Sequence, residues 1–251
     1  MKRAIAAAAA TLALTAAACA GPRVIPYPEG TDTRSEGASS APREIDHGSS
    51  PYFSSPDYYE LQSGEGRIVL THFPTYQQTR ENTCGSACGL MVMHYFGRGG
   101  SETEFTLAEK MGTKPYPIGT SLSGMVKAFR SLGWNADSKL DHPAFETYDA
   151  FRDFVRETLA KGRPIMVENV DWGGHWRVII GIDTMHEAST LDDVLIMADP
   201  YDTADHRQDG YVAVNGEKFF AMWFDHSMLP PEEANQPWLI AWPKDEAAAN
   251  K

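Results

Sequence analysis

Two cysteines lie close together where a polar loop gives way to an apolar run. In "YQQTRENTCGSACGLMVMHYF", Cys84 would begin a helix and Cys88 would lie one turn further in. The unpaired amides and the dipole at a helix N-terminus favour a thiolate, so a cysteine there can act as a nucleophile. Thr83 is the expected N-cap, and Gly85 would let backbone and substrate approach closely. We predict that Cys84 reacts and that Cys88 packs in the core as a small hydrophobe.

A disulfide and a metal site are the other possible uses of these cysteines. Cysteines four residues apart on a helix have Cα atoms about 6 Å apart, which permits a disulfide, but the Cβ directions rarely suit one. A zinc site would need further Cys or His ligands at short spacing, and none follows. Asp202, Asp205 and Asp209 lack the spacing of a calcium loop and are interpreted as turn residues. We expect no metal and no cofactor.

A cysteine nucleophile also requires a base and an acid that orients the base. Among eight histidines, His175 stands out because two glycines in "WGGHWRVIIGID" precede it at the start of an apolar run. Asp199 ends the next apolar run, "VLIMADPYD", and adjacent strands would bring its carboxylate to the His175 ring. Asp171 is too near to His175 in sequence, and Asp183 is at the far end of the same strand. Asp199 is therefore the preferred acid.

The elements that must position these residues change type midway along the chain. Apolar residues recur at helical spacing from Cys84 to Gly97, Phe105 to Met111, Met125 to Leu132 and Phe151 to Leu159. The expected N-terminal signals are a capping box of Ser101 and Glu104, then Ser121 or Ser123, then Thr147. Five short runs rich in β-branched or aromatic residues follow: "RPIMVENV", "HWRVIIGID", "DVLIMADP", "GYVAV" and "PWLIAW". This order predicts an α+β fold with a helical lobe packed on an antiparallel sheet.

The N-terminal residues predict export. Lys2 and Arg3 precede an apolar stretch from Ala4 to Leu14, as in a secretory signal. The following "AAAC" is similar to a bacterial lipobox with Ala in place of the usual Leu, so Cys19 is the expected site of lipidation; a plain secretory signal is the alternative. We predict a lipoprotein signal peptide at 1–18, a flexible tether rich in Gly, Pro and Ser at 19–57, one domain at 58–243 and a polar tail at 244–251. The expected location is the cell envelope, on the extracytoplasmic face.

Composition limits the partners. The chain of 251 residues is 42% hydrophobic and 22% charged, as is usual for a globular domain. Its net charge is −12 and it has no basic run, which argues against nucleic acid as a partner. The oligomeric state is not indicated.

The three motifs together resemble a known family. A Gln six residues before "CGSA", an apolar helix ending in "YFG", then "GGHWRVIIGID" and "ADPYD" are similar to papain-like cysteine peptidases, including the bacteriocin-processing, double-glycine-leader peptidases. Phytochelatin synthases share the layout more distantly. The resemblance covers roughly residues 68–242. It implies that Cys84 is the nucleophile, His175 the general base and acid, Asp199 the orienting acid and Gln78 the oxyanion-hole residue, with Gln77 out of register by one.

The resemblance and the signal together suggest a stand-alone lipoprotein that hydrolyses peptide bonds through a thioester. Two alternatives remain open. One is an acyl or peptidyl transferase with phytochelatin-synthase-like chemistry, in which an amine or thiol replaces water. The other is a surface binding module that keeps the fold without activity.

Overall fold

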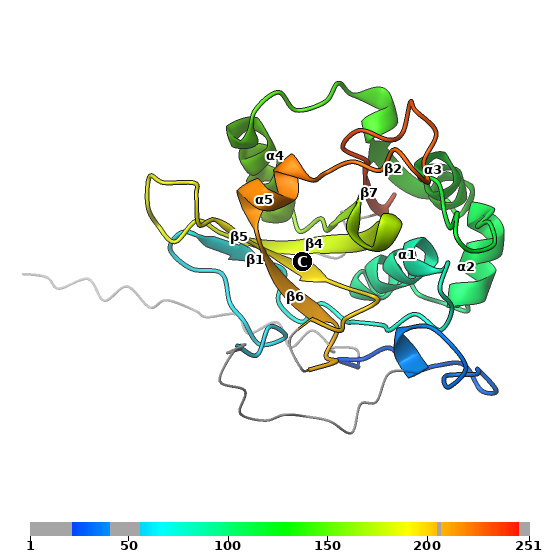
Figure 1. Cartoon of the computed structure of the whole chain (residues 1–251). Coiled ribbons are helices and arrows are strands. Elements are labelled where there is room, and N and C mark those ends of the chain that lie inside the picture. Colours follow the sequence, from blue (N-terminus) through cyan, green and yellow to red (C-terminus); the bar gives the residue numbers. More distant parts are fainter. Residues whose placement is uncertain (1–21, 41–55, 205–206, 246–251) are drawn as a thin grey trace, which may run out of the picture.

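The structure is a computed structural model that describes residues 22–40, 56–204 and 207–245 (Figure 1). Signal peptide, Cys19, part of the expected tether and most of the expected tail lie outside these residues. The described helices, with short 3-10 turns marked η, are η1 (Ala38–Ser40), α1 (Cys84–Tyr95), α2 (Glu104–Met111), α3 (Leu122–Ser131), η2 (Lys139–Asp141), α4 (Tyr148–Ala160), η3 (Asp171–Gly173) and α5 (Gly216–Ala221).

One seven-stranded sheet organises the molecule. Its strands are β1 (Arg67–Val69), β2 (Trp134–Ser138), β3 (Ile165–Asn169), β4 (His175–Asp183), β5 (Val194–Ala198), β6 (Tyr211–Asn215) and β7 (Trp238–Pro243). They lie in the order β2-β7-β3-β4-β5-β6, with β1 paired to β4, and every neighbouring pair is antiparallel. Helices α1, α2 and α3 form a group beside the sheet, while α4 and α5 lie together elsewhere along it (Figure 1). The predicted α+β class is confirmed.

Strand β4 is the centre of the sheet and carries His175 at its first position. Eight of its nine residues are buried, so this strand is covered on both faces. In the register, Asn169 lies opposite His175 on one side, and Val178 lies opposite Ala198 on the other. Asp199, which follows Ala198, therefore emerges at the same end of the sheet as His175.

The helix boundaries confirm some predicted caps and correct others. Ser121 and Thr147 cap α3 and α4 by accepting hydrogen bonds from Gly124 N and Ala150 N. The predicted capping box of Ser101 and Glu104 is wrong, because Thr103 and Thr106 form it instead. Glu104 is the first residue of α2 and is fully buried, so its carboxylate is directed to the interior rather than to its own helix.

Three elements were not expected from the sequence. Strand β1 is only three residues long, α5 only six, and β2 ("WNADS") is mostly polar, so none of them shows a clear apolar period. Strand β2 is nevertheless an edge strand, paired through its whole length with β7. Its structure is decided by the apolar partner strand rather than by its own composition.

Part of the N-terminal segment, residues 22–40, packs against the domain. Ile25 is buried in the core, and its amide donates to Thr75 O at 2.9 Å. Further along, Ser39 is buried and its amide donates to Gln78 O at 3.1 Å. Residues 22–40 thus pack along residues 75–81, because backbone pairing and a few buried side chains compensate for the polar composition.

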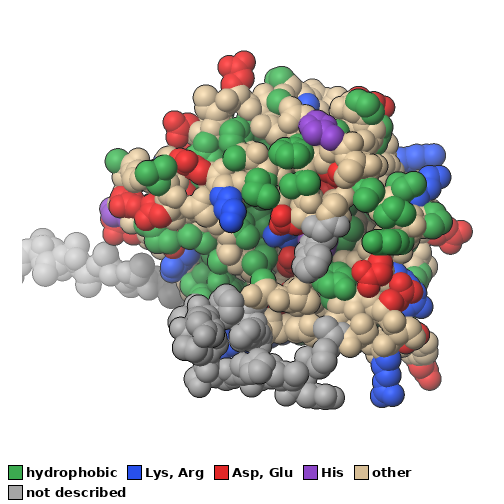
Figure 2. Space-filling view, viewed as in Figure 1, with side chains coloured by type: hydrophobic (Ala, Val, Ile, Leu, Met, Phe, Trp, Pro, Cys, Tyr) green, Lys and Arg blue, Asp and Glu red, His purple; other side chains and the backbone are tan. Residues whose placement is uncertain are grey.

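The face in Figure 2 shows a mixed surface. Acidic and basic side chains are interspersed among apolar and neutral ones, and no continuous basic patch is visible on this face. None of the helices in the described part of the chain is long and apolar enough to cross a membrane.

Candidate active site

Cys84 is the first residue of α1, as predicted. Thr83 occupies the N-cap position, but its side chain makes no capping bond. The Thr83 hydroxyl instead donates to Glu104 Oε1 at 2.5 Å and lies 2.9 Å from Arg80 O. No side chain therefore caps the first-turn amides of α1, and they remain available to negative charge that develops near Cys84.

Cys88 lies one turn inside α1 and is fully buried. Burial, the largest effect, raises the pKa of the Cys88 thiol well above its usual range. Both cysteines are free, so the disulfide alternative does not apply. Cys84 is 7% exposed and lines a cleft, whereas Cys88 is a packing residue, as expected from the sequence.

His175 lies between Asp199 and Cys84. Its Nε2 is 2.7 Å from Asp199 Oδ1, and both side chains are buried. Burial alone would lower the pKa of His175, but the charge and hydrogen bond of Asp199, followed by the hydrogen bond and charge of Cys84, raise it to about 9. A protonated imidazole beside a sulfur stabilises negative charge on that sulfur.

Asp199 is held in its charged form. Burial would raise its pKa, but the charge and hydrogen bond of His175, then the charge of Arg177 and the amide of Tyr201, lower it overall. The Tyr201 amide donates to Oδ1 at 2.7 Å, and Arg177 Nε lies 4.0 Å from Oδ2. This carboxylate therefore remains ionised while it orients the ring.

The competing acids have other partners. Asp171 is paired with Arg177, and Asp183 forms an ion pair of 3.2 Å with Arg67 at the far end of β4. Of the turn acids, Asp202 is buried and accepts from Gly210 N at 2.9 Å.

Within the described ranges, no group of three or more His, Cys, Asp or Glu side chains is arranged to hold a metal ion.

The two neighbouring glutamines differ in their surroundings. Gln78 lines the same cleft as Cys84, and its Nε2 donates to Arg80 O at 2.7 Å. An amide nitrogen carries two hydrogens, so a second one remains for another acceptor. Gln77 instead bridges the Asp199 loop, donating to Asp199 O at 2.8 Å and accepting from Asp202 N at 3.0 Å. Gln78 borders the cleft, and Gln77 fixes the loop that carries Asp199.

The cleft has a volume of about 150 Å³. Its lining includes His175, Glu168 and Gly174 from the sheet side of the sequence and the loop 116–120. In that loop Tyr116 is 72% exposed and Ile118 is 54% exposed, which gives the entrance an apolar side. The end of this loop is fixed, since the Trp176 indole donates to the Thr120 carbonyl at 2.9 Å.

Glu168 and its neighbour Asp225 were not singled out from the sequence. Glu168 lies in β3 and lines the cleft; Asp225 lies after α5 and is fully buried. The sequence does contain a signal for Glu168, because it is a charged residue within "IMVEN", a strand in which every residue is buried. No comparable signal marks Asp225, because it lies in a loop.

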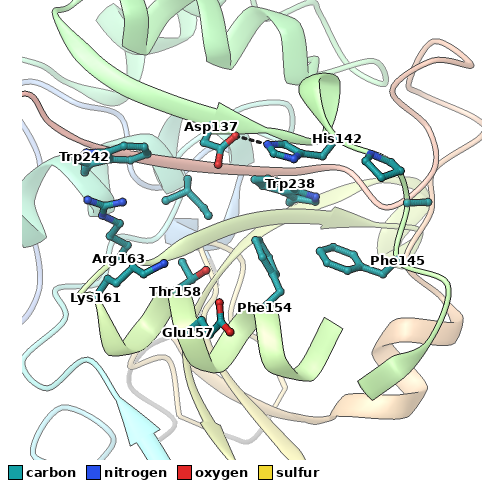
Figure 3. A pocket seen from close by; sticks show the side chains of 13 residues that line it. Asp137, His142, Phe145, Phe154, Glu157, Thr158, Lys161, Arg163, Trp238 and Trp242 are labelled. Atoms are coloured by element: carbon teal, nitrogen blue, oxygen red, sulfur yellow. Dashed lines mark hydrogen bonds and ion pairs between the residues drawn. The ribbon is translucent and has the colours of Figure 1, made fainter. Parts of the chain in front are cut away.

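A second cavity, of about 320 Å³, lies between α4 and the strands β2 and β7 (Figure 3). It also contains a histidine–acid pair, with His142 Nε2 at 2.7 Å from Asp137 Oδ1. Figure 3 shows these two side chains above aromatic residues such as Phe154 and Trp238. Neither cysteine nor serine is among the described residues that line it, so it lacks the nucleophile of the Cys84 cleft.

A cysteine at a helix start, facing a histidine and an aspartate held by an antiparallel sheet, is the arrangement of the papain-like cysteine peptidase fold. A family model confirms this class. The chain belongs to the Peptidase_C39 like family, whose model matches residues 70–224. No curated protein matches the sequence significantly.

Several solved structures are similar to this one at low sequence identity. The peptidase domain of Streptococcus ComA, a bifunctional ABC transporter of a quorum-sensing pathway, is 19% identical, with a TM-score of 0.46, 69% of this chain covered and 100% of that one. A double glycine motif protease from an AMS/PCAT transporter, solved with its leader peptide, is 17% identical (TM-score 0.40; 68% and 91% covered). A prointerpain A fragment from Prevotella intermedia is 13% identical (TM-score 0.43; 74% of each chain covered).

Proposed function

We propose that this protein is a cysteine peptidase that hydrolyses peptide bonds through a thioester on Cys84, and that it acts outside the cytoplasm, anchored by a lipid on Cys19. The observation that carries the catalytic part is His175, buried between the Asp199 carboxylate and Cys84 at the mouth of a cleft. Membership of a peptidase family supports a peptide or protein as the substrate. The anchor and the location rest on the signal-like N-terminus alone.

In the proposed reaction, Cys84 Sγ attacks the carbonyl carbon of the scissile amide as a thiolate. The oxyanion that forms would accept hydrogen bonds from the Gln78 side-chain amide and from backbone amides at the start of α1. The protonated ring of His175 then donates its proton to the leaving amine, and the C–N bond breaks to leave a thioester on Cys84. Neutral His175 next takes a proton from water, whose oxygen attacks the thioester, and the product acid leaves as Cys84 is restored.

The first test is hydrolysis of a defined peptide mixture, followed by mass spectrometry. Cys84→Ala is expected to abolish cleavage, and His175→Ala to be nearly as severe, because the same ring activates the thiol and protonates the leaving group. Gln78→Ala should lower turnover by about 10²–10³-fold with little change in KM, since its bond strengthens only as charge develops. Each variant must melt at the wild-type temperature.

Cleavage by Cys84→Ala in a clean preparation would refute the proposal that this protein is a cysteine peptidase. The inactive surface binding module would then be the remaining alternative. Addition of an amine acceptor separates hydrolysis from transfer, because a transferase would yield the acyl-amine product instead of the acid. Peptide mapping after iodoacetamide gives a further check. Cys84 is expected to be alkylated near neutral pH, and alkylation of Cys88 first would contradict the choice of nucleophile.

A further inference from the structure

Two buried carboxyl groups lie next to Gly174, the residue that precedes His175. Glu168 lines the cleft but is only 3% exposed, and Asp225 is fully buried. The Asp225 Oδ1 accepts three hydrogen bonds, from Ser227 N at 2.8 Å, Ser227 Oγ at 2.7 Å and Met228 N at 3.0 Å. These donors fix the position of the Asp225 carboxyl beside Glu168.

The remaining oxygens of the pair are unsatisfied. Among the described residues, neither Asp225 Oδ2 nor Glu168 Oε2 has a hydrogen-bond donor. Burial, then the nearby Asp225 carboxyl, then the charge of Cys84, raise the pKa of Glu168 well above its usual range. Burial beside a second acid therefore disfavours the charged form of Glu168 unless a positive group compensates it.

Both carboxyls lie beside the backbone that carries the proposed base. A Cβ atom at Gly174 would be 2.4 Å from Asp225 Oδ2 and 3.1 Å from Glu168 Oε1. Gly174 precedes His175 and has a φ of 134°, a conformation that L side chains rarely adopt. Because residue 174 is a glycine, the two acids can lie close to the backbone next to His175.

Among the described residues that line the cleft, His175 is the one basic side chain. Apart from His175, the ionisable side chains that line it at neutral pH are the two acids Glu168 and Glu81, together with tyrosines and Cys84 itself, and neither Lys nor Arg lines it among the described residues. Within the described lining, neither Lys nor Arg is available to pair with Glu168.

We propose that Glu168, backed by Asp225, binds a cationic group of the substrate, an ammonium or guanidinium close to the scissile bond. This rests on the proposed function, because the site borders Cys84. A cation that entered from the cleft would pair with the Glu168 carboxylate and favour its charged form. The charge-assisted bond would favour peptides with a lysine or arginine side chain, or a free terminal amine, near the cleavage point.

The test uses peptidyl acyloxymethyl ketones, which alkylate an active-site cysteine, in matched cationic and neutral pairs. The pairs are lysine against norleucine, arginine against citrulline, and a free α-amine against its acetylated form. The second-order rate of Cys84 labelling is measured by mass spectrometry. In the wild type, the cationic member of at least one pair should react about 10–100-fold faster, the size of one charge-assisted hydrogen bond. The pair with the largest ratio identifies the source of the cation.

Glu168→Gln should reduce that ratio to below about threefold, because an amide of the same shape lacks the charge. Glu157→Gln, an equal change of charge at an exposed position on α4, should leave the ratio as in the wild type. Glu168→Asp keeps the charge and should retain part of the preference. If Glu168→Gln slows both members of a pair equally, the role of Glu168 is structural and the proposal fails.

Three further outcomes would overturn the proposal. Equal labelling of every matched pair in the wild type would refute it while leaving the peptidase function intact. Collapse of the ratio in Glu81→Gln but not in Glu168→Gln would place the selectivity at the cleft rim instead. Failure of all probes to label Cys84 would refute the proposed function, and this inference with it.

Discussion

His175 interacts with two acidic groups, the Asp199 carboxyl and the Cys84 thiol. Asp199 Oδ1 lies 2.7 Å from Nε2, and Cys84 also acts on the ring. Burial disfavours the imidazolium, but the two partners outweigh it and the pKa rises to about 9. The ring is therefore protonated at neutral pH, which is the form that accompanies a thiolate and donates to a leaving amine.

This predicts the pH dependence of the reaction. In the wild type kcat/KM should fall as the pH rises through about 9, because the imidazolium then loses its proton. Asp199→Asn removes the largest effect that raises this pKa, so the alkaline limb should move to lower pH by about one unit or more. The measurement is a pH–rate profile with a peptide substrate.

Asp183→Asn is the matched control for this prediction. Asp183 lies at the other end of β4 and is paired with Arg67, so its loss should leave the alkaline limb in place. A limb that moves in Asp183→Asn, or stays fixed in Asp199→Asn, would show that the orienting acid is assigned incorrectly.

At the scale of elements, one buried carboxylate connects the start of α2 to the loop that precedes α1. Glu104 accepts from Tyr76 Oη at 2.9 Å, from Thr79 N at 2.9 Å, from Thr79 Oγ1 at 2.7 Å and from the Thr83 hydroxyl. These donors flank Gln78 on both sides and reach the N-cap of α1. The backbone of Gln78 is fixed as well, because its amide donates to Pro200 O at 2.8 Å.

We predict that Glu104→Gln lowers the free energy of unfolding by about 2 kcal/mol or more, because an amide turns a donor toward hydroxyls and amides that need an acceptor. Urea denaturation measures this. Glu109→Gln, an exposed change of charge on the same helix, should stay within about 0.5 kcal/mol of the wild type. Equal effects of the two substitutions would mean that the Glu104 bonds contribute little to stability.

At the scale of the whole molecule, a helical lobe supplies Cys84 and a sheet supplies His175 and Asp199. The cleft lies where they meet, and residues 22–40 pack along the loop that leads into α1. The chain between this packed segment and Cys19 is therefore short, and a lipid on Cys19 would keep the domain near the membrane surface.

Cys19→Ser is expected to move the protein from the membrane fraction to the soluble fraction after cell lysis. A single lipid-modified cysteine is the anchor that the N-terminal sequence predicts, and an unmodified serine cannot carry it. Cys84→Ala, which removes a cysteine from the folded domain, should remain with the membrane. Retention of Cys19→Ser in the membrane fraction would contradict lipid anchoring.

The sequence by itself determined the class of fold and the main candidates for chemistry, because those signals are local. The apolar period after Cys84 predicts α1, the two glycines mark His175, and an apolar run ending in Asp-Pro marks Asp199. Each of these features is contained within about a dozen residues, so neighbouring residues are sufficient to define it.

Only the tertiary structure decided which distant groups meet. The pairing of Glu168 with Asp225 joins residues that are far apart in sequence, and so does the binding of the Gln78 loop by Glu104. Asp199 reaches His175 through the register of β4 with β5, which shifts at a bulge between Ile179 and Gly181. A buried charge in a sequence indicates that some partner is needed, but the packing of the whole chain selects that partner.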